Sequence, residues 1–155
     1  MTLRLAAERP LGKLAKWLRI LGFDTAYQTG SSLEKFVRNL ERGRILLCRS
    51  RRLPEPWMST ETIRIESDHL EEQLKQVITV LGLTEQDFNL FSRCIRCNLP
   101  IVELDKDVVR GKVPDFVWET QESFSRCPAC GRIYWSGSHL ERSRHRVQRL
   151  LDMVL

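Results

Sequence analysis

The sequence predicts an α/β protein, in which a small parallel sheet flanked by helices is followed by a cysteine-containing region that ends in a helix. Two observations support this prediction. Short apolar runs alternate with stretches of helical periodicity over residues 3–82, a pattern that favours parallel strands connected by helices. Four of the five cysteines then follow in two Cys-x-x-Cys pairs. The length of 155 residues suits one medium domain or two small ones.

The first expected strand is the apolar run Leu3–Ala7. A helix should follow, because Pro10 suits the first position of a helix, leucines recur at helical spacing, and Gly22 suits the residue after the last turn. Thr25–Tyr27 is the candidate for a second, brief strand. These segments give the first strand–helix–strand unit of the expected sheet.

A second helix and two further strands are expected next. Ser31 and Glu34 have the spacing of a capping box, which predicts a helix that ends near Gly43. Arg44–Cys48 is apolar throughout after its first residue, as is typical of a strand buried on both faces. Ile63–Ile65 is the candidate for a fourth short strand.

The last helix of the first domain is expected after Asp68, which forms a second capping-box pattern with Glu71. Leucine, valine and isoleucine continue at helical spacing from there. Thr84–Asn89 is the expected linker. We therefore expect residues 1–88 to form the α/β domain and residues 89–155 to form the second domain.

The second domain is expected to hold three short strands, at Ile101–Leu104, Phe116–Trp118 and Ile133–Trp135. A final helix should run from Ser138 to Met153, with Ser138 and Glu141 in capping-box spacing. This helix carries four arginines and two histidines beside leucine and valine. It can serve as an RNA-facing arm or as a docking helix for a protein partner.

The two cysteine pairs form the strongest chemical signal in the sequence. Two Cys-x-x-Cys turns can supply the four thiolates of a closed tetrahedral zinc site, which is structural because it leaves no coordination position for catalysis. Asn98 and Gly131 each follow a pair and tolerate the positive φ that such turns require. The rival interpretations are a redox pair, an iron–sulfur cluster and unpaired core cysteines. The predicted Zn²⁺ ligands are Cys94, Cys97, Cys127 and Cys130, and Cys48 is expected to be a small buried apolar residue.

Composition narrows the class of protein without fixing a function. The net charge is +5, from 25 lysines and arginines against 20 acidic residues, and the first 52 residues carry 12 basic and 4 acidic side chains. A basic surface favours a polyanionic partner but does not by itself indicate nucleic acid. The sequence contains no apolar run of membrane-spanning length and no secretory pattern at its start, so we expect a cytoplasmic protein without a membrane partner. The odd number of cysteines disfavours a disulfide framework.

The order of motifs resembles the Mut-seven C-terminal ribonuclease family over nearly the whole chain. The segments that carry the resemblance are RLAAERPLGKLAKWLRILGFDT, GRILLCRSRRL, SDHLEEQLKQV, RCIRCN and CPACGRIYWSGSH. The resemblance implies a PIN-like α/β domain joined to a zinc ribbon. It also implies hydrolysis of RNA phosphodiester bonds with Mg²⁺ or Mn²⁺ held by acidic side chains at the carboxyl ends of the parallel strands.

The acidic residues that the resemblance carries over are Glu8, Asp24 and Asp68, which are the predicted catalytic residues. Each also has a simpler explanation: Glu8 can interact with a helix dipole, Asp24 can stabilise a turn and Asp68 can cap a helix. The chain departs from the family pattern at other acidic positions. Ser50 replaces the usual Asp, and the expected acidic stretch is Thr-Gly-Ser-Ser at residues 29–32. The alternative to an endoribonuclease is therefore a catalytically weakened RNA-binding protein.

RNA contacts are predicted at the end of the third strand and in the second domain. A strand end rich in arginine favours phosphate over a bare cation, although a solvated loop explains the same residues. Tyr134 and Trp135 can stack on bases, or they can fill the core of the ribbon instead. A protein-interaction module that does not bind RNA is the third hypothesis. The predicted RNA-binding residues are Arg49, Ser50, Arg51, Arg52, Trp135 and His139.

Overall fold

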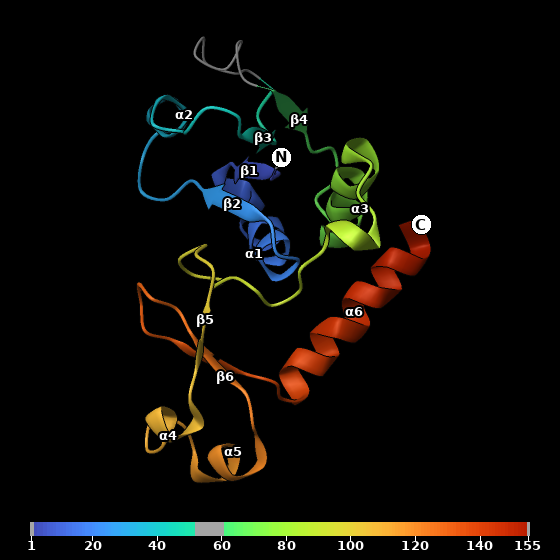
Figure 1. Cartoon of the computed structure of the whole chain (residues 1–155). Helices are drawn as coiled ribbons and strands as arrows, with labels where there is room; N and C mark the ends of the chain where they lie inside the picture. The colour runs from blue at the N-terminus through green and yellow to red at the C-terminus, as the bar shows by residue number, and fades with distance from the viewer. Residues whose placement is uncertain (1, 52–60, 155) are drawn as a thin grey trace. The chain divides into compact units, whose positions relative to one another are not determined.

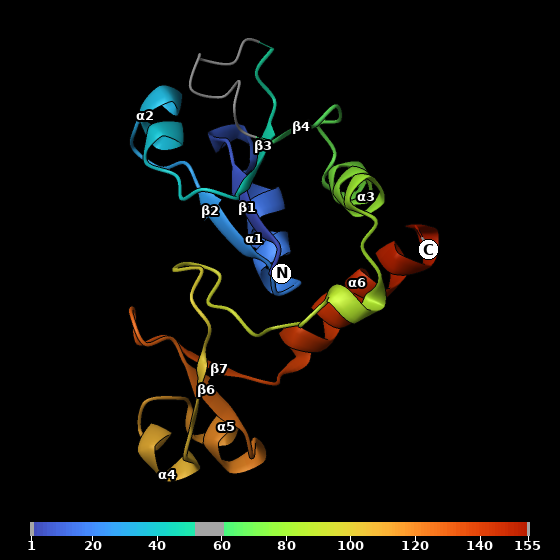
Figure 2. The ribbon, with the colours of Figure 1, turned by 45° about the horizontal axis from the view of Figure 1, so that its top comes forward.

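The computed structural model describes residues 2–51 and 61–154, and Figures 1 and 2 show it from two directions. The chain divides into two compact units, Met1–Phe91 and Ser92–Leu155. They are called unit 1 and unit 2. No helix in the described part of the chain is both long enough and apolar enough to cross a membrane.

Unit 1 is built on a four-stranded sheet in which all neighbouring strands are parallel. The strand order is β2-β1-β3-β4, with β1 in register with both β2 and β3. Parallel neighbours need crossover connections, and helices supply most of them. The strands are β1 (Arg4–Ala7), β2 (Asp24–Tyr27), β3 (Ile45–Cys48) and β4 (Thr62–Arg64).

Helices cover both faces of this sheet (Figure 1). Alternate residues of a strand point to opposite faces, so Ala6 and Leu46 face one side while Leu5 and Leu47 face the other. Ala6 and Leu46 form a buried cluster with Val37 of α2. On the other side α1 contacts β1, β2 and α3. The helical elements of unit 1 are η1 (Arg9–Leu11), α1 (Gly12–Ile20), α2 (Leu33–Arg38), α3 (Leu70–Leu81) and η3 (Glu85–Asp87).

The chain leaving α3 returns to the turn between α1 and β2. The backbone N–H groups of Asn89 and Phe91 donate to the carbonyls of Leu21 and Ile20, each at 2.9 Å. Gly22, with a φ of 99°, lies beneath this segment, and a Cβ there would be 2.4 Å from the carbonyl oxygen of Asn89. Glycine is therefore required by both its conformation and its close approach.

Unit 2 contains a three-stranded antiparallel sheet with order β5-β6-β7. Two short helices join β5 to β6, and a cysteine-bearing turn joins β6 to β7. The long helix α6 follows β7 (Figure 2). The elements are β5 (Val102–Leu104), α4 (Lys106–Val109), α5 (Asp115–Thr120), β6 (Phe124–Arg126), β7 (Ile133–Trp135) and α6 (Ser138–Val154).

The predicted fold class is confirmed: a small parallel sheet flanked by helices is followed by a second small sheet and a cysteine cluster. One predicted strand, Phe116–Trp118, is wrong, because this segment belongs to helix α5. Val117 is buried in the core of unit 2 and its neighbour Trp118 packs against the same core, so successive side chains do not alternate between two faces as they would in a strand. Pro114 lies at the N-cap of this helix.

Candidate functional site

The carboxyl ends of the parallel strands lie along one edge of the unit 1 sheet, the usual place for a ligand in such folds. The residues that follow β1 and β2 are Glu8 and Gln28, and those that follow β3 are Arg49 and Ser50. The chain after β4 adds Asp68, whose carboxylate pairs with Arg49. We call these five residues the carboxyl edge.

Glu8 is the centre of the carboxyl edge, with only 4% of its surface exposed. Its Oε1 accepts the backbone N–H groups of Arg49 and Ser50, at 2.8 and 3.1 Å. Its Oε2 accepts the Ser50 hydroxyl at 2.5 Å. Its backbone N–H donates to the carbonyl of Leu47, at 3.0 Å. The carboxylate therefore holds the end of β1 to the loop that leaves β3, with both of its oxygens occupied.

Arg49 connects this loop to the segment after β4. One guanidinium nitrogen donates to the carbonyl of Ile65 at 2.8 Å, and the other forms an ion pair with Asp68. The Asp68 side chain is 84% exposed, so the pair adds little stability, although it places a positive charge directly against this carboxylate. The capping role expected for Asp68 is not found, because His69 is the N-cap of α3 and no side chain caps it.

Gln28 belongs to the same edge. Nothing in the sequence marks it as a candidate site residue except its position directly after a strand. It is 5% exposed. Its amide oxygen accepts the backbone N–H of Arg9 at 3.0 Å, and its amide nitrogen donates to the carbonyl of Ser31 at 3.0 Å. Gln28 thereby ties the start of η1 to the loop after β2. Helix α2 begins after this loop, and its N-cap is Ser32 instead of the expected Ser31.

The structure does not bring Asp24 to the carboxyl edge. Asp24 is the first residue of β2 and lies beside Arg4, the first residue of β1, at the amino end of the sheet. Its carboxylate pairs with Arg44 at 2.8 Å, and the Arg44 side chain, 8% exposed, also donates to the carbonyl of Leu5. A strand of four residues spans roughly 13 Å, so Asp24 and Glu8 sit at opposite ends of the sheet.

The carboxyl edge does not fit a catalytic Mg²⁺ or Mn²⁺ ion. Such ions bind several oxygen ligands, usually including carboxylates that compensate the charge. Here Glu8 is surrounded by three hydrogen-bond donors, Ser50 contributes a hydroxyl instead of a carboxylate, and Asp68 is paired with Arg49. Within the described residues, no group of three acidic or histidine side chains gathers closely enough to hold a metal.

The other predicted RNA-binding residues lie in different surroundings. Arg51 is exposed immediately after Ser50, whereas Arg52 lies outside the described residues. Trp135 packs against the buried core of unit 2, with its ring 6.5 Å from that of Phe124, which agrees with the core-packing interpretation. His139 lies in the first turn of α6, and its side chain is outside the described part of the structure.

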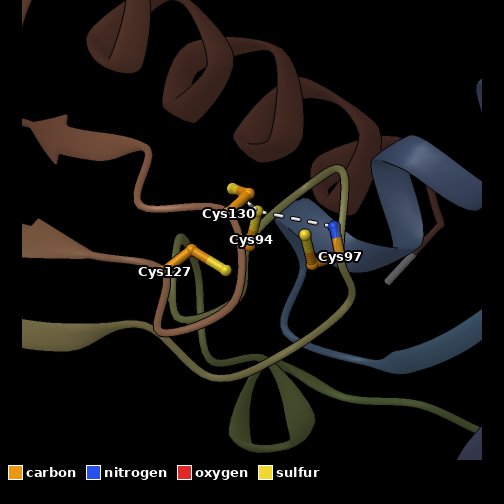
Figure 3. Close-up of side chains that lie close together, drawn as sticks. All are labelled: Cys94, Cys97, Cys127 and Cys130. Atoms are coloured by element: carbon orange, nitrogen blue, oxygen red, sulfur yellow. Dashed lines mark hydrogen bonds between the residues drawn. The ribbon is translucent and has the colours of Figure 1, made fainter.

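Unit 2 holds a second candidate site, made by the two cysteine pairs (Figure 3). The first pair lies in the turn before β5 and the second in the turn between β6 and β7. Both turns use positive φ where expected, at Asn98 with 61° and Gly131 with 75°. The four sulfur atoms lie within 4.8 Å of one another, and they belong to Cys94, Cys97, Cys127 and Cys130.

These sulfur positions fit a tetrahedral metal site. Four sulfurs about 2.3 Å from a zinc ion lie about 3.8 Å from one another. The Sγ atoms of Cys94 and Cys130 are 3.8 Å apart. Burial alone would raise the pKa of the Cys94 thiol, but hydrogen bonds from the Tyr134 hydroxyl and the Cys97 backbone lower it to about 6. These hydrogen bonds favour the thiolate form of Cys94, which is the form that binds metal. The group can hold a structural metal such as zinc.

Fold and sites together define an α/β sheet protein with an attached cluster of four cysteines that can hold a metal. Residues 3–147 match the family model described as Mut7-C RNAse domain. The chain belongs to this family, and membership indicates a ribonuclease-like function with RNA as the partner. Searches of curated proteins and of solved structures each returned no significant match.

Proposed function

We propose that this protein binds RNA at the carboxyl edge of a PIN-like domain and hydrolyses it weakly or not at all. The observation that carries the proposal is the enclosure of the Glu8 carboxylate by Arg49 and Ser50. In the resemblance to the family, Ser50 stands where an aspartate is usual. Serine in place of aspartate removes one negative charge, and the Ser50 hydroxyl donates a hydrogen bond to the Glu8 carboxylate.

Charge explains why this change weakens hydrolysis. A divalent ion that activates water against a phosphodiester needs carboxylates to hold it. Glu8 and Asp68 are the acidic groups at this edge, and Arg49 opposes Asp68. A cation placed here would have to displace three donors from Glu8 and would meet a guanidinium group nearby. The same positive groups favour the approach of a phosphate.

Arg51 is the side chain best placed to contact RNA phosphates in the described part of unit 1. It is exposed and directly follows the loop held by Glu8. Several other arginines of this unit are already engaged, for example Arg4 and Arg38 in ion pairs with glutamates and Arg19 with a backbone carbonyl. The large excess of basic residues in the first 52 positions therefore overstates the charge that is available to a ligand.

Helix α6 is the second surface that we assign to RNA. Val147, Leu150 and Leu151 form its buried side. Arg142, His145 and Arg149 are exposed and follow one another at intervals of three and four residues, which places them on one face. The two arginines give this face a positive charge, which suits a phosphate backbone. Stable binding of a protein, together with no binding of RNA, would instead assign this helix to a protein partner.

The binding test compares Arg51→Ala with Lys75→Ala, which removes the same charge from an exposed position of α3. A labelled single-stranded RNA is titrated with zinc-loaded protein at several salt concentrations. Loss of one phosphate contact should weaken binding and lower the slope of log affinity against log salt by about 0.7 for Arg51→Ala. Lys75→Ala should retain the wild-type slope. Equal slopes in all three proteins would remove Arg51 from the interface.

The cleavage test uses Mn²⁺ and three variants at the carboxyl edge. Wild type should cleave RNA no faster than Glu8→Gln, which sets the background. Ser50→Asp should gain cleavage because it restores a carboxylate, and Ser50→Ala, which removes the hydroxyl without adding charge, should gain none. Mn²⁺-dependent cleavage by wild type that Glu8→Gln abolishes would instead establish a metal-dependent endoribonuclease, with Glu8 and Asp68 as candidate ligands.

We also propose a structural Zn²⁺ ion at the four cysteines and a cytosolic location. None of the five cysteines forms a disulfide in the structure, which suits a reducing compartment. The spacing of the sulfurs supports zinc with no open coordination position, so this metal would stabilise unit 2 and take no part in hydrolysis. Metal analysis that finds less than one zinc per chain would contradict the assignment.

A further inference from the structure

Tyr134 makes a direct contact with a cysteine of the metal centre. Its Oη lies 3.1 Å from the Sγ of Cys94. The same oxygen accepts the backbone N–H of Ile95 at 3.3 Å. The Arg132 guanidinium lies over the phenol ring, 5.6 Å from its centroid. The hydroxyl group is therefore held by two hydrogen bonds, while the Arg132 cation lies over the face of the ring.

The direction of the hydrogen bond follows from the chemistry of the two groups. A thiolate that binds a metal carries no proton, so it can only accept. The phenol has one proton to donate, and its oxygen already accepts from Ile95. Tyr134 must therefore donate to Cys94. The Cys97 backbone N–H, 3.4 Å from the same sulfur, is a weaker second donor (Figure 3).

This hydrogen bond joins parts of unit 2 that the sheet does not connect directly. Cys94 belongs to the turn before β5, and Tyr134 belongs to β7. The sheet order β5-β6-β7 separates these two strands. The second cysteine pair lies in the turn just before β7. The phenol thus ties the first cysteine turn to the strand that follows the second turn, and so brings the two turns together.

We propose that Tyr134 is a positioning residue of the metal centre, whose hydroxyl holds Cys94 in its coordinating orientation and reduces electron donation from this sulfur to the metal. Hydrogen bonds to metal ligands typically contribute 10- to 100-fold in metal affinity. The role is independent of RNA binding at the carboxyl edge. It also gives the aromatic residue a different role from the base stacking that its sequence context allows.

The test compares wild type, Tyr134→Phe and Arg132→Met as full-length proteins. Tyr134→Phe removes only the hydroxyl, whereas Arg132→Met removes the cation over the ring and keeps the hydroxyl. Zn²⁺ affinity is measured by competition with a chromophoric chelator, and each protein is also loaded with Co²⁺ to record its sulfur-to-cobalt charge-transfer band. Tyr134→Phe should bind Zn²⁺ about 10- to 100-fold more weakly. Its charge-transfer band should move to longer wavelength, because a sulfur without the hydrogen bond donates electrons more readily.

The outcomes separate metal positioning from general packing. Arg132→Met should retain both the wild-type affinity and the wild-type band. Wild-type behaviour of Tyr134→Phe in both measurements would overturn the proposal. Equal losses in the two variants would also overturn it, because the ring and not the hydroxyl would then be responsible. A Tyr134→Phe protein that stays unfolded at saturating Zn²⁺ would overturn it as well, since the hydroxyl would then support the fold itself.

Discussion

The stability of Glu8 variants tests whether this residue is a structural clamp or a metal ligand. Glu8→Ala removes the acceptor of two backbone N–H groups, those of Arg49 and Ser50, and of the Ser50 hydroxyl. An N–H group left without a partner in a buried site costs about 1–3 kcal/mol. Removing the buried carboxylate returns part of this cost, since its desolvation is itself unfavourable. We expect a net loss of about 3 kcal/mol in the free energy of unfolding.

Glu8→Gln should be milder. Its amide oxygen can still accept both N–H groups, and the Ser50 hydroxyl can rotate to accept from the amide nitrogen. The free energy of unfolding should then fall by about 1 kcal/mol, because hydrogen bonds to a neutral amide are weaker than hydrogen bonds to a carboxylate. With a urea dependence of about 2 kcal/mol per molar, the unfolding midpoint should fall by about 1.5 M for Glu8→Ala and about 0.5 M for Glu8→Gln.

The assay is urea unfolding of the zinc-loaded chain, followed by circular dichroism, with and without Mn²⁺. Glu34→Ala serves as the control, because this exposed glutamate pairs with Arg38 on the surface of α2 and should contribute less than about 0.5 kcal/mol. Two results would refute the clamp. One is a Glu8→Ala protein as stable as wild type. The other is stabilisation of wild type by Mn²⁺ that Glu8→Ala abolishes, the behaviour of a metal ligand.

Three further predictions address other parts of the chain. Asp24→Asn should lower the free energy of unfolding by about 1–3 kcal/mol, because it weakens the ion pair with the buried Arg44 side chain. The affinity for RNA should not change. Weaker RNA binding by a folded Asp24→Asn protein would contradict the placement of Asp24 away from the carboxyl edge. A strong chelator should unfold the small sheet of unit 2, so that its amide hydrogens exchange rapidly, while the amides of the parallel sheet in unit 1 still exchange slowly. Unchanged amide exchange in unit 2 would argue against the metal centre. Burial and the nearby Glu8 carboxylate raise the pKa of the Cys48 thiol to about 11, and the side chain is 1% exposed. Iodoacetamide at pH 8 should therefore leave Cys48 unmodified in the folded protein and alkylate it after denaturation, and modification of the folded protein would contradict this placement.

The strands of unit 1 could be predicted because their signals are local. Arg44–Cys48 is a continuous apolar run, and β3 is buried along its whole length. The cysteine turns were equally accessible, since the spacing within each pair and the residue type after it define the turn without long-range information. The strand expected at Phe116–Trp118 failed for a local reason too: three residues are too few to distinguish alternation from a helical turn.

The arrangement of the carboxyl edge could not be predicted, because it depends on pairs distant in sequence. Asp68 matches a capping box, but its carboxylate pairs instead with Arg49, which lies 19 residues earlier. Gln28 belongs to no motif, and its importance follows only from the loops that it joins. The end of the sheet on which a residue lies was decisive for Asp24. Asp24 is the first residue of β2 and therefore lies at the amino end of the sheet, whereas the carboxyl edge is formed by residues that follow the strands.

The same geometry explains why family membership alone does not establish hydrolysis for this chain. A fold positions the ends of its strands, but the charge placed there decides whether a divalent cation or a phosphate is attracted. At this edge one carboxylate is enclosed by donors and another is opposed by a guanidinium, while Arg51 is exposed beside them. Restoring a single carboxylate at Ser50 adds negative charge without removing Arg49. Ser50→Asp should therefore recover only part of a metal site, and Ser50→Asp combined with Arg49→Gln should cleave RNA faster than Ser50→Asp alone.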